Sequence, residues 1–194
     1  MSTVPDDVLN PGVEEKIAVA RTKKDEGDQA FKEGDFTKAL RAYHESTFYL
    51  TGIYKNAMST AMPSPAEAPS DVKTPKTEAD IMLDKIYSNM TQCHIKRENW
   101  KRAIETADKA LSKNSLNTKA LFRKGKALGE LGHFEKAEKI MDDLLTKSIP
   151  DSEKAAIKTE LARLRAMDKE REKEHNKKFK GFLNRGDKGD KEEK

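Results

Sequence analysis

The chain has 194 residues, of which 37% are charged, 35% hydrophobic and only 6% aromatic. Such a chain is too polar for a thick globular core, and it fits a thin helical array in which each helix buries one apolar stripe. The formal charge of +4, from 38 basic and 34 acidic residues, indicates solubility rather than nucleic-acid binding.

The cysteine content and the hydropathy limit the cellular setting. Cys93 is the one cysteine, which excludes an internal disulfide framework and fits a reducing compartment. The first residues lack the apolar core of a signal peptide, and no stretch approaches the length of a membrane span. We therefore expect a cytoplasmic protein, with a nuclear location left open.

In chain order, residues 1–12 contain prolines and Gly12 and predict a flexible N-terminus. A helical pattern begins at Val13. Residues 58–77 then hold four prolines among serines and threonines, which exclude a continuous helix and predict a flexible insertion. Helical patterns follow the insertion, and few stretches alternate in the way a strand does, so we expect an all-helical protein.

Three segments share one layout, in which a helix ends, a short turn follows and an aromatic residue opens a second helix three residues before an alanine. The aromatic residues and alanines are Phe36 and Ala39, Trp100 and Ala103, and Phe134 and Ala137. The last two alanines are 34 residues apart, the period of the tetratricopeptide repeat (TPR). The first two are 64 residues apart, and the excess of 30 falls where the prolines lie.

Each repeated residue type has a physical purpose. The alanines allow the two helices of a pair to approach closely, the aromatic residues fill the turn between them, and Gly27 and Gly125 occupy crowded helix contacts. A single repeat cannot bury its own apolar face, so the three must stack, and a last helix must cover the end. A helix over 151–185 fits this purpose, because Ala155, Leu161, Leu164 and Met167 fall on one side of it.

The expected fold class is therefore all-α, with three TPR helix pairs in a right-handed α-solenoid followed by a long C-terminal capping helix. The expected divisions are a flexible N-terminus at 1–12, repeat 1 at about 13–57, the insertion at 58–77, repeat 2 at about 78–114, repeat 3 at about 117–148, the capping helix at 151–185 and a disordered tail at 186–194, so that the TPR domain covers 13–185.

Two short segments carry a closer resemblance. Residues 120–125, Ala-Leu-Phe-Arg-Lys-Gly, and residues 179–182, Phe-Lys-Gly-Phe, resemble TPR domains of the co-chaperone type. The similarity covers about residues 13–184 and points to the TPR half of FKBP-type immunophilins and to the tetratricopeptide repeat protein 9 group. The resemblance implies a protein-binding groove with a carboxylate clamp, which holds the acidic C-terminus of a heat-shock chaperone of the ninety- or seventy-kilodalton class.

The family pattern of the clamp is Lys-x-x-x-Asn, then Asn, then Lys-x-x-x-Arg. The matching positions here are Lys24, Asp28, Asn89, Lys119 and Arg123. Lys119 and Arg123 are four residues apart and share a helical face, where a bound carboxylate would relieve their mutual repulsion. An arginine can bind a carboxylate with two parallel hydrogen bonds, and a lysine adds a mobile charge. First helices of the repeats line the concave face, so we expect these side chains to converge.

Asp28 departs from this pattern, because the family usually has Asn there. An anion at this position would repel an acidic ligand, and it could pair with Lys24 one helical turn earlier. Two interpretations follow. The groove is a weakened or retuned clamp for a chaperone tail, or the protein is an adaptor that binds another peptide or helix.

No catalytic or cofactor pattern stands beside the clamp. Four scattered histidines and Cys93 give no metal-site spacing, and the glycines near residues 125–132 do not form a phosphate loop. We therefore predict no enzyme activity, cofactor, metal or nucleic-acid partner. Residues 175–185 are basic with interleaved aromatics, which is compatible with a calmodulin-type or membrane-surface helix, although an overhanging capping helix is favoured.

Overall fold

The computed structural model describes the backbone of residues 11–60 and 77–189, and the side chains of residues 12–53 and 77–180. Within these ranges the chain forms seven α-helices and no strand, which confirms the predicted all-α class. The helices are α1 (Pro11–Lys32), α2 (Phe36–Thr60), α3 (Glu78–Lys96), α4 (Trp100–Lys113), α5 (Thr118–Glu130), α6 (Phe134–Leu145) and α7 (Asp151–Gly189). Most of the predicted N-terminus, insertion and tail lies outside the described residues, and the predicted repeat boundaries stay predictions.

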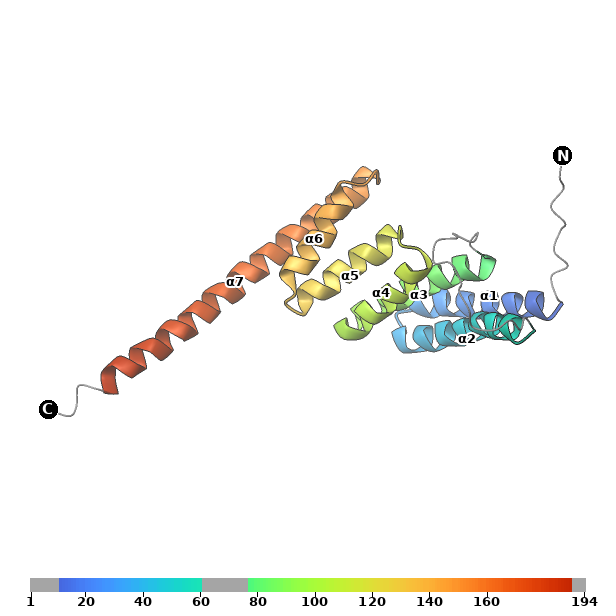
Figure 1. Ribbon diagram of the computed structural model, residues 1–194, viewed down its shortest axis with the longest axis horizontal. Helices are drawn as coiled ribbons and strands as arrows, with labels where there is room; N and C mark the ends of the chain where they lie inside the picture. The colour runs from blue at the N-terminus through green and yellow to red at the C-terminus, as the bar shows by residue number, and fades with distance from the viewer. Residues whose placement is uncertain (1–10, 61–76, 190–194) are drawn as a thin grey trace, which may run out of the picture. The chain divides into compact units, whose positions relative to one another are not determined.

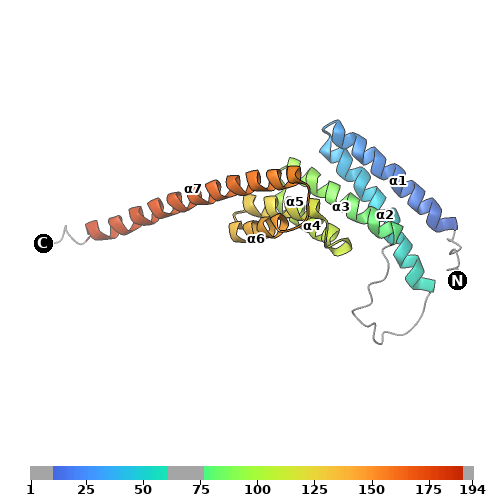
Figure 2. The ribbon, with the colours of Figure 1, turned by 90° about the horizontal axis from the view of Figure 1, so that it is seen from above.

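The helices pack as two compact units, residues 1–123 and 124–194, and the boundary falls inside α5. In the first unit α1 and α2 lie side by side, α3 packs against α2, and α4 packs against α3 (Figures 1 and 2). In the second unit α7 packs along α6. None of the described helices is both long and apolar enough to cross a membrane.

The turns inside the three helix pairs have the same backbone geometry. Each contains one residue in the left-handed region, namely Gly34 (φ 82°), Glu98 (φ 56°) and Gly132 (φ 84°). In each turn this residue donates its backbone N–H to the carbonyl three residues earlier, and the next residue donates to the carbonyl five residues earlier. This closes the first helix of each pair with the hydrogen bonds typical of a left-handed C-cap. The left-handed residues repeat with the same spacing as the three alanines.

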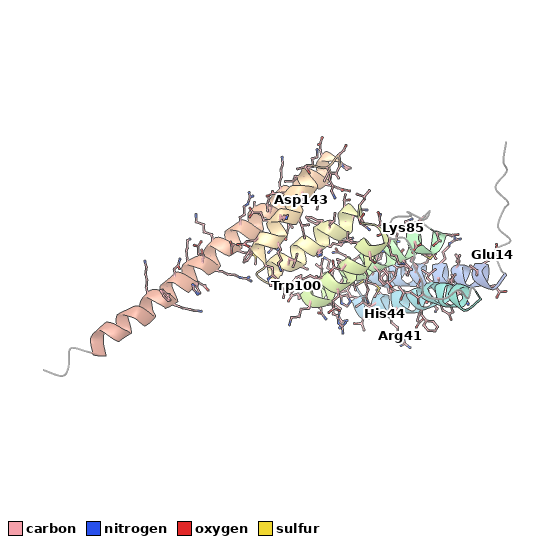
Figure 3. The ribbon with its side chains drawn as sticks, viewed as in Figure 1. Glu14, Arg41, His44, Lys85, Trp100 and Asp143 are labelled. Carbon is pink, nitrogen blue, oxygen red and sulfur yellow. The ribbon has the colours of Figure 1, made fainter. Side chains whose placement is uncertain are left out.

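The repeated alanines are buried, as close helix packing requires. Ala39, Ala103 and Ala137 each lie in the first turn of the second helix of a pair, and each is fully buried. The aromatic residues that open these helices are only partly buried. One of them, Trp100, lies at the start of α4 (Figure 3). Phe36 packs against the core of the first unit from its edge.

The first unit has a continuous core between α1, α2 and α3. Tyr43 and Leu50 of α2 meet Leu83 and Ile86 of α3 within one cluster of buried side chains. A buried hydroxyl adds to this packing, because Ser46 donates to the carbonyl of Ala20 at 2.6 Å. The partnered hydroxyl avoids the penalty of burying a polar group without a hydrogen bond.

In the second unit, α7 buries Ile157, Leu161 and Leu164. The prediction was correct for the two leucines but wrong for Ala155, which is exposed. Ile157, Leu161 and Leu164 are spaced by four and three residues and form one continuous helical stripe, from which Ala155 is turned away. Leu164 packs directly against Gly129, where an added Cβ would collide with the leucine side chain.

Gly27 supplies a test of the packing between α1 and α2. A Cβ at Gly27 would lie 2.6 Å from Cε1 of the buried Tyr43 ring, whereas a Cβ at Gly52 would meet nothing within 4 Å. Both positions gain about 1 kcal/mol of helix propensity on change to Ala, but only Gly27→Ala suffers overpacking of roughly 1–3 kcal/mol. We expect Gly52→Ala to raise the free energy of unfolding, and Gly27→Ala to be about 1–3 kcal/mol less stable than Gly52→Ala. Urea unfolding followed by circular dichroism measures the difference, and equal stabilities would contradict the contact.

Candidate functional site

The Asp28 carboxylate is the centre of a hydrogen-bond network between α1, α2 and α3. Lys24 Nζ lies 2.6 Å from Asp28 Oδ2, which confirms the pairing that the four-residue spacing suggests. The Tyr43 hydroxyl donates to Asp28 Oδ1 at 2.6 Å, and Asn89 Nδ2 donates to the same oxygen at 3.0 Å. Asp28 therefore accepts one donor from each of the three helices.

The network fixes the charges of its members. Burial alone raises the pKa of Asp28, but the hydrogen bonds from Lys24 and Tyr43, the Lys24 charge and the Asn89 amide outweigh burial and lower this pKa below its usual value. Burial and the adjacent Asp28 carboxylate together raise the pKa of Tyr43 far above its ordinary value. At neutral pH the network consequently contains a carboxylate, an ammonium group and a neutral phenol.

Arg123 of α5 is held by Ser88 of α3, the residue before Asn89. Its Nη1 donates to the carbonyl oxygen of Ser88 at 2.6 Å and to the Ser88 hydroxyl at 2.7 Å. Burial is the main cause that lowers the pKa of Arg123. No carboxylate forms an ion pair with Arg123 within the described parts of the chain. A guanidinium carries five N–H donors, so three of them are left after the two contacts to Ser88.

Asp28 and Arg123 line one cavity of about 270 Å³. Asp28, Asn89 and Arg123 line it, together with Phe31, Lys32, Tyr43 and Gln92. The cavity thus has an apolar and aromatic part beside its polar groups. Such a combination suits a ligand that carries both an anionic group and an apolar side chain.

Three of the five clamp residues predicted from the sequence line the cavity, and two do not. Asp28, Asn89 and Arg123 line one cavity, and Lys24 reaches it through Asp28. Lys119 is exposed, one helical turn before Arg123 on the same face of α5, and does not line the cavity.

Sequence reasoning missed Tyr43 and Ser88 as parts of the site. Tyr43 has the pattern of a core residue, and its ring is buried as such. Only its hydroxyl belongs to the site, which no sequence spacing indicates. Ser88 precedes Asn89 on α3, so its position next to the predicted Asn89 was the one available signal.

The lowered pKa of Asp28 predicts a pH-dependent contribution to stability. A carboxylate whose pKa is lower in the folded than in the unfolded chain stabilises the fold above its unfolded pKa, and this contribution disappears as the pH falls through the folded value. We expect Asp28→Asn to lower the free energy of unfolding near pH 7 by on the order of 1–3 kcal/mol. This difference should persist to about pH 5 and shrink as the pH drops below 3.8, the ordinary aspartate value.

Unfolding by urea at pH 7, 5 and 3 measures this effect. Asp25→Asn is the matched control. It is the same substitution on the same helix, but the Asp25 side chain is 69% exposed. A difference between the wild type and Asp28→Asn that is as large at pH 3 as at pH 7 would contradict the assignment.

Comparison with known proteins gives relatives that match most of the chain. No family model matches the chain. The chain is 30% identical over 179 residues to peptidyl-prolyl cis-trans isomerase FKBP42 of Arabidopsis thaliana, which covers 91% of this chain and 44% of the relative. It is 31% identical over 149 residues to human FKBP4, which covers 77% of this chain and 28% of the relative. The chain spans less than half the length of either relative.

Two solved structures illustrate the fold that this chain shares. The Saccharomyces cerevisiae Hsp90 co-chaperone Cns1 has a TM-score of 0.66 at 20% identity, covering 90% of this chain and 47% of the Cns1 chain. The C-terminal TPR-containing domain of a Plasmodium falciparum FK506-binding protein has a TM-score of 0.63 at 20% identity, covering 83% and 95%. Together with the 34-residue spacing and the repeated turn, these similarities show that the chain has the TPR fold and is related in sequence to FKBP-type proteins.

Proposed function

We propose that the chain is a protein–protein interaction module, a co-chaperone adaptor that binds the acidic C-terminus of a heat-shock chaperone. The observation that carries this proposal is Arg123, a partly buried guanidinium without a carboxylate partner in the described parts of the chain. Buried charges in proteins are normally paired, because removing an unpaired charge from water costs on the order of several kcal/mol. An acidic ligand would supply the missing partner.

The donors around Arg123 fit a carboxylate. Ser88 fixes one edge of the guanidinium and leaves three N–H groups for a ligand, enough for a two-pronged contact. Lys119 stands on the same face of α5 and adds a second, mobile charge. Lys32 also lines the cavity, so its lining contains two cationic side chains, Lys32 and Arg123, and one carboxylate, Asp28, which is paired with Lys24.

The structural neighbours support the class of ligand. The first TPR of Spaghetti (RPAP3), with a TM-score of 0.55 at 18% identity, was solved bound to the HSP90 peptide SRMEEVD. The second TPR domain of human RPAP3, with a TM-score of 0.53 at 17% identity, was solved with the HSP70 peptide SGPTIEEVD. Both peptides end in two glutamates, a valine and an aspartate, which matches a cavity with cationic donors beside apolar walls.

The proposal includes the absence of catalysis and a cytoplasmic location. The Plasmodium falciparum neighbour is a C-terminal TPR-containing domain, and the isomerases FKBP42 and FKBP4 match this chain over less than half of their own length. We expect no prolyl isomerase turnover, and a cytoplasmic chaperone as the partner.

A second candidate is an adaptor for some other peptide or helix, without chaperone-tail recognition. Asp28 favours it, because this carboxylate lies inside the cavity where an acidic tail would have to fit. The two candidates differ in what Arg123 contributes. An adaptor of the second kind would tolerate its replacement, whereas recognition of an acidic tail depends on it.

Titration calorimetry with the peptide SRMEEVD tests the proposal. We expect the peptide to bind, and we expect its affinity to fall by roughly tenfold or more when each of its acidic side chains is replaced by the corresponding amide. Arg123→Lys keeps the charge but loses the two-pronged contact, and should weaken binding by roughly tenfold. Lys119→Ala should weaken it by roughly three- to tenfold.

Lys101→Ala is the matched control for Lys119→Ala, because Lys101 is an exposed lysine on α4 that does not line the cavity. It removes the same charge from the first unit and should change the affinity by less than about twofold. Two results would reject the proposed site. One is equal binding of SRMEEVD and of the peptide whose acidic side chains are replaced by amides; the other is an equal loss of affinity in the two lysine variants.

A further inference from the structure

Two donors that the clamp pattern assigns to a ligand, on Lys24 and Asn89, already have an acceptor in Asp28. Lys24 Nζ and Asn89 Nδ2 both contact Asp28, at 2.6 and 3.0 Å, and the Tyr43 hydroxyl completes the set at 2.6 Å. A carboxylate from the protein thus accepts hydrogen bonds from the residues that would otherwise bind a carboxylate of the ligand. Arg123 lines the same cavity and has no carboxylate acceptor in the described parts of the chain, where it donates to the carbonyl and hydroxyl oxygens of Ser88.

We infer that Asp28 is a resident carboxylate, which takes the place of one ligand carboxylate and thereby sets the ligand class: peptides anchored by acidic side chains at Arg123 and Lys119, without a requirement for a free C-terminal carboxylate. This inference rests on the proposed function, since it concerns the same cavity, but it makes a separate claim about which anionic group the cavity reads.

The donor count supports the inference. Asp28 Oδ1 accepts from two groups, Tyr43 and Asn89, and so uses both of its usual acceptor sites. Lys24 is shared between Asp28 at 2.6 Å and Asp25 at 3.5 Å. A second carboxylate entering beside Asp28 would have to displace these contacts and would also meet the negative charge of Asp28. Two carboxylates in contact repel unless one takes up a proton.

Arg123 lies in a different electrostatic setting. Arg123 lines the cavity and Lys119 lies one helical turn before it on α5, and neither has an acidic partner in the parts of the chain whose side chains are described. An acidic side chain of a ligand is therefore attracted to Arg123, while a chain terminus placed near Asp28 gains nothing from its negative charge.

A two-by-two titration tests this inference. The protein is the wild type or Asp28→Asn, and the ligand is SRMEEVD with a free or an amidated C-terminus. Asn keeps the size of Asp and removes its charge. We expect the wild type to bind the two peptides within about twofold of each other, and Asp28→Asn to bind the free acid on the order of tenfold more tightly than the amide. The coupling between the two changes isolates the pairwise effect.

Asp25→Asn is again the matched control. It changes the total charge equally, on the same helix, and it also removes the weaker partner of Lys24, but Asp25 does not line the cavity. We expect Asp25→Asn to bind both peptides alike, as the wild type does. Discrimination by Asp25→Asn equal to that of Asp28→Asn would show a general charge effect and overturn the inference.

A measurement on the wild type guards against an Asp28→Asn protein that does not fold. In a ¹⁵N spectrum with saturating SRMEEVD, the Arg123 Nε–H resonance should shift, while the side-chain amide of Asn89 should keep its position because it stays bonded to Asp28. A shift of the Asn89 amide as large as that of Arg123 would overturn the inference.

The two proposals fail in different ways. A wild type that prefers the free acid by tenfold rejects the resident carboxylate and leaves the chaperone-tail function intact. A wild type whose binding does not depend on the acidic side chains of the peptide, or on Arg123, rejects the proposed function itself.

Discussion

The contact between Gly27 and the Tyr43 ring is the constraint on which the rest of the first unit depends. Because Gly27 has no Cβ, the Tyr43 ring can lie against α1 and bring its hydroxyl to Asp28, the next residue along the chain. The same buried ring is part of the core that joins α1, α2 and α3. Helix packing and the polar network are thus built from the same side chain, so a change that moves the ring also moves the centre of the site.

The repeat architecture could be predicted from the sequence because its signals are local or periodic. Three alanines at matched spacing, each three residues after an aromatic, predicted the helix pairs, and the structure buries all three alanines fully. The turn geometry was less visible, since two of the left-handed positions are glycines but the third is Glu98. A residue with a Cβ carries a cost there, and only the surrounding packing of the helix pair imposes that conformation.

The site could be predicted only in part, for a physical reason. The Lys24–Asp28 pair follows from a spacing of one helical turn, which a sequence displays directly. The contact between Asn89 and Asp28 joins residues 61 positions apart, and the contact between Arg123 and Ser88 joins residues 35 positions apart. Contacts of this kind depend on how α1, α3 and α5 pack. A family pattern can name the residues, but it cannot show that one of them is already bonded to another.

A clamp with Asn at position 28 and the clamp present here represent two solutions to one electrostatic problem. Donors gathered to hold an anion repel one another and lose solvation until the ligand arrives, so an empty clamp is destabilised. Asp28 removes that penalty for Lys24 and Asn89 by supplying a permanent acceptor, at the expense of the affinity that these donors could have given a ligand. Arg123 keeps the unrelieved state, with Ser88 as its only hydrogen-bond partner in the described region. Within one cavity, Asp28 and its donors thereby contribute to stability, while Arg123 is left for recognition of a ligand.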